Sequence, residues 1–173
     1  MKQTKGQTGF SLIELLIVVA IIGIIAAIAI PNLLASRRAA NEGSAQSSLR
    51  TIHSAEATFQ ATVGNGNFGG LTAGSSVAPV TETLISQKLV DPVLGLGQKS
   101  GYNFAVTPVN AVASTNTLAS FHGTADPIVD SGASQSGTRI FGITEDGVMR
   151  GGPGTTAYAS RAAVDTATAL GNQ

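Results

Sequence analysis

The sequence has no cysteine and no tryptophan, and only 12% of its 173 residues are charged. Without cysteine the chain has no disulfide framework, no thiolate metal site and no thiol nucleophile. Ten basic side chains balance ten acidic ones, so the total charge indicates no nucleic-acid partner. Small residues are abundant, including 21 glycines. This composition predicts a small core in one domain of ordinary size, with an extended element beside it.

Catalytic and ligand-binding signatures are also scarce. Of the two histidines, His53 falls on the polar side of a predicted helix and is expected to be solvated. His122 precedes Asp126 and Asp130, but Asp-Pro at 126–127 is more typical of a turn than of a metal site. Residues 95–100 lack the glycine before the lysine that a phosphate-binding loop requires. We therefore expect no metal, no cofactor and no enzyme.

A long run without polar side chains is the dominant feature of the sequence. Residues 15–30 are all apolar, and residues 10–30 would span roughly 31 Å as a helix, close to the thickness of a bilayer core. Residues 1–9 contain Lys2 and Lys5 and no acid. We expect residues 1–9 to form a basic leader and residues 10–30 a transmembrane segment. No aromatic ring lies between Phe10 and Phe59, so this segment offers no continuous aromatic path for electron transport.

Beyond Pro31 the helical pattern continues but becomes one-sided. An apolar stripe at spacings of three and four residues runs through Leu49, Ile52, Ala55 or Glu56, Phe59 and Val63. Asparagine and glycine follow at 65–66 and glycines at 69–70, which terminate a helix. The pattern predicts one helix over residues 10–63.

Residues 64–150 carry the signals of a β-containing head. Residues 102–106 alternate and end before Pro108, residues 118–123 form a second candidate strand, and 139–144 and 148–150 flank Glu-Asp-Gly, a hairpin signal. A short helix is predicted over 81–89, with Thr81 as its N-cap. We expect an α+β fold: the long helix packs on three or four antiparallel strands. Residues 151–173 form a small-residue tail, either loose or ordered by neighbours.

The segment GFSLIELLIVVA at residues 9–20, continuing to Pro31, closely resembles the start of type IV pilins and pseudopilins. The resemblance covers the basic leader and residues 9–31; the head has no comparable motif. It implies that a membrane peptidase cleaves between Gly9 and Phe10 and that the new amine of Phe10 is methylated. Glu14 would then face the N-terminal amine of a neighbouring subunit in a filament. An acid inside an apolar span costs about 2.5–3.5 kcal/mol on insertion scales, and so indicates a function.

Gly23 and Pro31 weaken the apolar helix. Glycine costs about 1 kcal/mol relative to alanine, and proline cannot donate to the carbonyl four residues back. The resemblance implies that this stretch loses regular helix in assembled pili.

The resemblance implies a structural pilus subunit, held in the bacterial inner membrane as a precursor and extracellular once assembled. Its partners would be other copies of the chain, the peptidase and methyltransferase, an inner-membrane assembly platform and, before assembly, the lipid bilayer. The alternatives are a minor tip pilin and a type II secretion pseudopilin, whose head usually carries an acidic calcium loop. A further alternative is a secreted soluble binding protein with an ordinary signal peptide cleaved near Ala-Ile-Ala at 27–29.

Overall fold

The structure, a computed structural model, describes residues 9–71 and 83–171. The chain divides into two compact units, Met1–Ser36 and Arg37–Gln173. Helix α1 (Leu12–Thr62) begins in the first unit and continues in the second. It confirms the predicted long helix to within two residues at each end.

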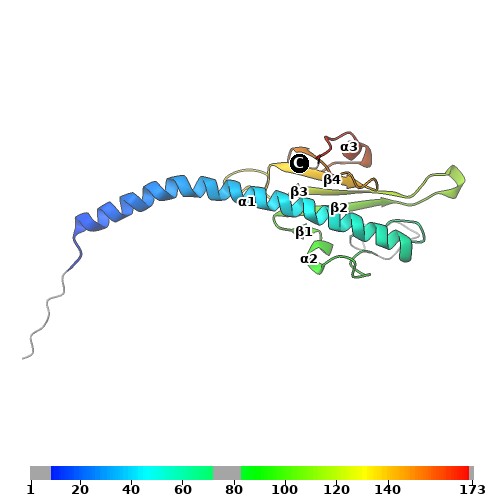
Figure 1. The fold of residues 1–173 in the computed structure, drawn as a ribbon, viewed down its shortest axis with the longest axis horizontal. Coiled ribbons are helices and arrows are strands. Elements are labelled where there is room, and N and C mark those ends of the chain that lie inside the picture. Colours follow the sequence, from blue (N-terminus) through cyan, green and yellow to red (C-terminus); the bar gives the residue numbers. More distant parts are fainter. Residues whose placement is uncertain (1–8, 72–82, 172–173) are drawn as a thin grey trace, which may run out of the picture. The chain divides into compact units, whose positions relative to one another are not determined.

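The second half of α1 supplies one side of the core of the head (Figure 1). Leu49, Ile52 and Phe59 are completely buried, as the stripe in the sequence predicts. Val63 is wrong as a core residue because the helix ends at Thr62, and its side chain is 41% exposed. The core cluster comprises Ala45, Leu49, Ile52, Ala55, Phe59, Phe68, Leu71, Leu84, Val90, Leu94, Tyr102, Phe104, Val106, Phe121, Ala125, Phe141, Ile143 and Met149.

The C-terminal end of α1 is closed by backbone hydrogen bonds from the residues that follow the helix. The Gly64 amide donates to the Phe59 carbonyl at 2.8 Å, and the Gly66 amide donates to the Gln60 carbonyl at 3.1 Å. Asn65 and Gly66 have positive φ angles of 48° and 86°. Asparagine and glycine tolerate this left-handed backbone best, so these residues end the helix where the sequence predicts.

A five-stranded antiparallel sheet forms the other side of the core, and its strands are ordered as they occur in the chain. Its elements are β1 (Gln98–Lys99), β2 (Tyr102–Val109), β3 (Ser120–Pro127), β4 (Arg139–Thr144) and β5 (Arg150–Pro153). The α+β prediction is confirmed. The extra strand is β1, which has only two residues and too little pattern to detect. It pairs with β2 across a turn at Ser100 and Gly101, both with positive φ.

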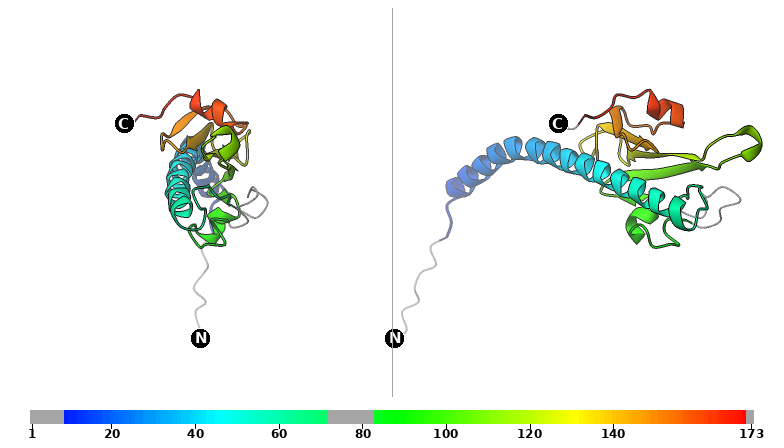
Figure 2. Two further views of the ribbon diagram at one scale, coloured as in Figure 1. Left: turned by 90° about the vertical axis from the view of Figure 1, so that its right-hand side faces the viewer. Right: turned by 45° about the vertical axis from the view of Figure 1, so that its right-hand side comes forward.

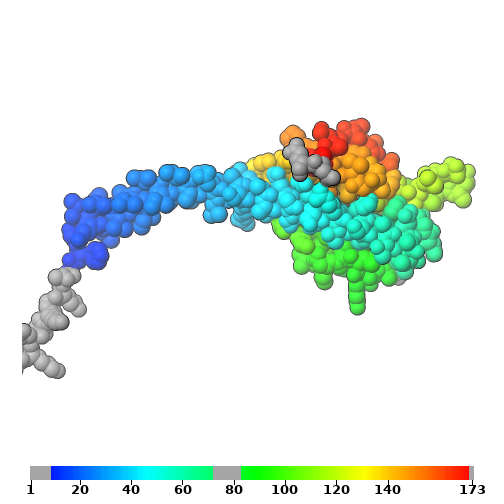
Figure 3. Space-filling view, in the orientation of Figure 1, coloured from blue at the N-terminus to red at the C-terminus, as the bar shows by residue number. Residues whose placement is uncertain are grey.

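The β2–β3 connection projects from the head as an arm (Figures 2 and 3). Residues 111–118 are all exposed, and the arm contains a 3₁₀ turn, Ala113–Thr115. A bridge between Val112 and Thr117 closes the arm. At its base, the Ala111 amide donates to Asn67 Oδ1 at 2.8 Å. The arm is therefore fastened to the turn that follows α1.

The hairpin predicted at Glu-Asp-Gly is confirmed as the β4–β5 turn. The Gly147 amide donates to the Thr144 carbonyl at 3.0 Å, and Gly147 has a φ of 74°. The Asp146 side chain accepts from the Val148 amide and from the Arg150 guanidinium. This interaction with Arg150 lowers the pKa of Asp146 to about 2.

The predicted helix at 81–89 is wrong over residues 83–89, which form hydrogen-bonded turns; its proposed N-cap, Thr81, lies outside the described residues. Thr83 and Ser86 instead exchange backbone-to-side-chain bonds with each other. Short side chains of this kind offer the backbone an alternative to a helix. The short helix of this region is α2 (Pro92–Gly95), which is capped by Asp91.

Residues 151–171 are ordered within the chain itself, unlike the loose tail that their composition allows. They include most of β5 and the helix α3 (Arg161–Asp165). Val164 is fully buried, and Gly142 on β4 leaves room for it because a Cβ there would lie 2.8 Å from its methyl group. Arg161 also pairs with Glu145 and Asp165. Salt bridges and one buried valine thus hold α3 against the sheet, in a chain that has no cysteine for a disulfide.

Candidate functional site

The first half of α1 presents apolar side chains on every side. From Leu12 to Ile30 its large hydrophobic residues are between 49% and 80% exposed. The helix is long and apolar enough to cross a membrane, judged by length and composition. Exposed apolar surface of this extent marks a membrane or protein interface.

Glu14 lies in the first turn of this helix and binds its backbone. The Ser11 amide donates to Glu14 Oε2 at 2.9 Å, and the Leu15 amide donates to the Ser11 carbonyl at 3.2 Å. Serine before the first helical residue with glutamate three positions later is the sequence of a capping box, and its glutamate half is formed here, which satisfies the Ser11 amide at the helix start. The spacing is visible in the sequence. Glu14 therefore has a role within its own chain that the predicted intersubunit role does not include.

Gly9 and Phe10 lie outside α1 and are both exposed. A Cβ placed on Gly9 would meet nothing within 4 Å, and the Phe10 side chain is 86% exposed. The peptide bond between them is therefore accessible and non-helical. A protease requires extended, accessible backbone, which glycine supplies easily.

Gly23 and Pro31 are both accommodated within α1, which is continuous through them. Pro31 has no N–H to donate to the Ala27 carbonyl. At the next residue, Asn32 Nδ2 donates to the Ile28 carbonyl at 3.1 Å. A side-chain bond thus supplements the ladder near the proline. The loss of regular helix expected in assembled filaments stays a prediction.

The second half of α1 contains another acid, Glu56, and its side chain is completely buried. Its Oε2 accepts from the Gly69 amide at 2.8 Å, while its Oε1 has no hydrogen-bond partner among the described residues. Burial without a cation raises the pKa of Glu56 to about 8, although the Gly69 bond opposes the shift. The sequence stripe admitted either Ala55 or Glu56 at this position, and both are buried.

The prediction that His53 is solvated is wrong. Its side chain is half-buried, with its ring centroid 6.1 Å from that of Phe121 and Nε2 3.5 Å from the Glu145 carbonyl oxygen. The β4–β5 turn folds over this ring, a contact between segments far apart in the sequence. Among the described residues, no group of three or more His, Asp or Glu side chains is placed to hold a metal ion.

Comparison with known proteins adds an independent line of evidence. The family model of the prokaryotic N-terminal methylation motif matches residues 4–30. The type IV wide pilus major component PilA4 of Thermus thermophilus is 37% identical over 121 residues, which cover 65% of this chain and 91% of that protein. No solved structure matches the chain significantly.

Two shorter matches concern the N-terminal part of related proteins. The type IV major pilin protein PilA of Myxococcus xanthus is 49% identical over 51 residues, covering 30% of this chain and 23% of that protein. Type II secretion system core protein G of Vibrio cholerae is 38% identical over 55 residues, covering 32% of this chain and 38% of that protein.

The exposed apolar helix, the methylation motif and the helix-on-sheet head define a protein of the class that carries an N-terminal methylation motif. The match to PilA4, which extends over nearly the whole of that relative, is more specific. The chain belongs to the type IV pilin family.

Proposed function

We propose that the chain is the structural, non-catalytic subunit of a type IV pilus and assembles through the first half of α1. The single observation that carries the proposal is the exposure of apolar side chains all round that helix. Water is a poor solvent for such a surface, so it requires lipid before assembly and other copies of the same helix afterwards. The relatives named as pilus components support this function.

We infer that maturation occurs between Gly9 and Phe10 and that the amine of Phe10 is then methylated. The match to the methylation motif and the accessible backbone at this bond support both steps. The enzymes required are a prepilin peptidase and a methyltransferase. Before assembly the chain resides in the bacterial inner membrane beside an assembly platform; afterwards it is extracellular.

In the assembled filament Glu14 pairs with the amine of Phe10 on a neighbouring copy. Its Oε2 already accepts from the Ser11 amide, so the carboxylate is held at the start of the helix with its second oxygen available. In a low dielectric an opposite charge stabilises this carboxylate strongly. Because only one axial offset pairs every Glu14 with an amine, the pair sets the register of the filament.

A second candidate function is that of a type II secretion pseudopilin, which the similarity to core protein G favours. Both functions use the same helix, so the N-terminal motif does not separate them. The longer match is to a wide-pilus component, and this supports the pilus function first.

Electron microscopy of sheared surface filaments, with mass spectrometry of their main component, tests the proposal. We expect this chain as the main component, beginning at N-methylated Phe10. A mature chain beginning near residue 30 would show that an ordinary signal peptidase acts instead. Glu14→Gln should abolish or greatly shorten the filaments, whereas Glu42→Gln, a matched change in the head, should not. Normal filaments from Glu14→Gln would refute the pairing.

A further inference from the structure

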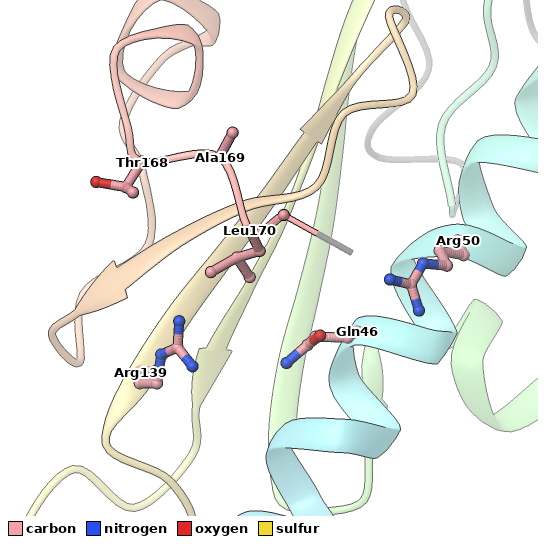
Figure 4. A pocket seen from close by; sticks show the side chains of 7 residues that line it. Gln46, Arg50, Arg139, Thr168, Ala169 and Leu170 are labelled. Atoms are coloured by element: carbon pink, nitrogen blue, oxygen red, sulfur yellow. The ribbon is translucent and has the colours of Figure 1, made fainter. Parts of the chain in front are cut away.

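A cleft of about 550 Å³ lies within the second unit, between α1, β4 and the segment that follows α3. Figure 4 shows Gln46 and Arg50 on α1 facing Arg139 on β4 across this space. Thr168, Ala169, Leu170 and Gly171 complete its lining. Neither the fold nor the proposed role of the N-terminal helix explains this cleft.

The sequence periodicities place these side chains together. Gln46 and Arg50 are four residues apart on α1, so they share one helix face. Arg139 has the same parity on β4 as Phe141 and Ile143, which lie in the core that α1 covers. Arg139 therefore emerges on the α1 side of the sheet, at the start of its strand. Its guanidinium lies 5.5 Å from the centroid of the Phe141 ring.

Neither arginine of the cleft has an acidic partner among the residues that the structure describes. No carboxylate there lies within 4.0 Å of Arg50 or Arg139, and no described group accepts a hydrogen bond from either guanidinium. The other two arginines of this end of the chain differ. Arg150 and Arg161 are both paired, with Asp146, Glu145 and Asp165 shared between them. The cleft thus holds two unneutralised guanidiniums.

The wall of the cleft opposite α1 is fixed rather than loose. The Gly151 amide donates to the Thr168 carbonyl at 3.0 Å, and the Leu170 amide donates to the Met149 carbonyl at 2.8 Å. Leu170 also packs against the core. The cleft is therefore formed before any ligand enters, which lowers the entropic cost of binding.

We propose that the cleft binds a carboxylate of a second copy of this chain and that Asp130 supplies it. A guanidinium is always charged and matches a carboxylate with two parallel hydrogen bonds. Two guanidiniums in one concavity also repel each other, and an entering carboxylate relieves that repulsion. Gln46 provides a further polar group beside the charge.

Asp130 is selected by the charge pattern of the second unit. Four of the described acids there, Asp91, Glu145, Asp146 and Asp165, already pair with cations. Glu56 is buried, Glu42 accepts from Thr138, and Asp126 accepts from Asn103. Asp130 is exposed, and its carboxylate accepts only from the hydroxyl of adjacent Ser131 within the described chain. It is therefore available to a neighbour.

The inference rests on the proposed filament, which brings many copies of the chain into contact. The first experiment compares filaments of the double variant Arg50→Gln and Arg139→Gln with those of Lys88→Gln, a surface cation outside the cleft. We expect at least about ten-fold less intact filament from the double variant after a salt challenge, because one side of an interfacial charge pair is lost. Lys88→Gln should behave as the wild type. Thermal unfolding of the monomers checks that the variants fold equally well.

The second experiment exploits the absence of cysteine. In filaments of the double variant Gln46→Cys and Ser131→Cys, which keeps Asp130, mild oxidation should produce a dimer ladder, since each cleft would lie beside the Asp130 position of another copy. Either single variant should give no ladder. A disulfide within one chain leaves the mass unchanged, so only bands at multiples of the chain mass count.

Two results would overturn the inference while leaving the pilus function intact. One is unchanged salt resistance of filaments of the double arginine variant. The other is the absence of a dimer ladder from the double cysteine variant when its filaments otherwise resemble those of the wild type. Failure of the unmodified chain to form filaments would instead overturn the proposed function. A separate measurement tests whether the cleft binds a small free anion. It compares the unfolding midpoint of the purified protein in acetate and in chloride at equal ionic strength. If acetate raises the unfolding midpoint of the purified protein and the arginine variants still form normal filaments, the site takes small anions and the intersubunit contact is wrong.

Discussion

The two halves of α1 belong to one helix but have opposite surroundings. From Leu12 to Leu33 the large apolar side chains are about half exposed or more, whereas Leu49, Ile52 and Phe59 are fully buried by the head. The first half is apolar on all sides, so no single face of a small head could cover it. The second half carries its apolar residues on one stripe. The difference teaches that the helix is divided by pattern, not by a break in its backbone.

The two acids of α1 extend the comparison. Glu14 sits at the helix start and accepts from a backbone amide, while Glu56 sits inside the head with one oxygen unpaired among the described residues. The first is expected to gain a cation from another subunit. The second has no cationic partner in the part of the chain that the structure describes, and its burial favours the protonated form instead.

The largest expected effect comes from the ionisation of Glu56. The folded-state pKa of about 8 exceeds the ordinary value of 4.5, so the folded chain retains a proton that the unfolded chain releases. The free energy of unfolding is therefore highest below pH 4.5, falls between pH 4.5 and 8, and then stays level. The total loss is about 5 kcal/mol. Glu56→Gln should remove this dependence, as measured by denaturant unfolding from pH 4 to 9.

Glu42→Gln is the matched control because it removes an acid from the same helix without touching the core. It should unfold with the pH dependence of the wild type. A flat profile for the wild-type chain itself would show that Glu56 is ionised in the folded state.

A matched pair of isoleucines tests the division of the helix directly. Ile52→Ala should lower the free energy of unfolding by about 2–5 kcal/mol, because it removes a fully buried side chain and leaves a cavity. Ile22→Ala, at a site that is 59% exposed, should change it by less than about 0.5 kcal/mol. Detergent-solubilised monomers and urea unfolding provide the measurement. Equal losses would mean that the first half also packs within its own chain.

The β4–β5 turn predicts a smaller effect. Asp146→Asn should cost about 1 kcal/mol at neutral pH, a figure reduced for solvent screening because the Asp146 side chain is 38% exposed. Arg150 lowers the folded pKa of Asp146 to about 2, so the wild type keeps this contribution above pH 3.8 and loses it as the pH falls toward 2. Thermal unfolding across this range should show the difference between the chains shrinking. If the difference between the two chains stayed constant with pH, the loss of stability in Asp146→Asn would come from the turn conformation rather than from the charge.

The smallest effect on the single chain is expected from Pro31→Ala. The substitution restores a donor to the Ala27 carbonyl within an otherwise continuous helix, so the head should unfold at an unchanged temperature. Filaments should become stiffer, with extension under force measured by optical tweezers. Unchanged extensibility would contradict the idea that residues 23–31 yield.

Periodic and local signals were sufficient for much of the fold. The 3–4 spacing around Ile52 located the buried face of α1, and the Asp-Gly turn at 146–147 located the β4–β5 hairpin. Contacts between distant segments could not be read in this way. His53 is covered by a turn 92 residues away, and Arg139 lines the same cleft as Gln46 only because strand parity and helix face coincide. The Ser-x-x-Glu spacing at 11–14 is present in the sequence, but it lies at the start of an apolar run that favours an interpretation of Glu14 as an acid in a membrane span.

The composition of the core makes the head independent of the N-terminal apolar segment. Every residue of the core cluster comes from position 45 onward, so the head completes its hydrophobic packing without using the N-terminal apolar segment. The packing of the head is therefore independent of what surrounds the first half of α1.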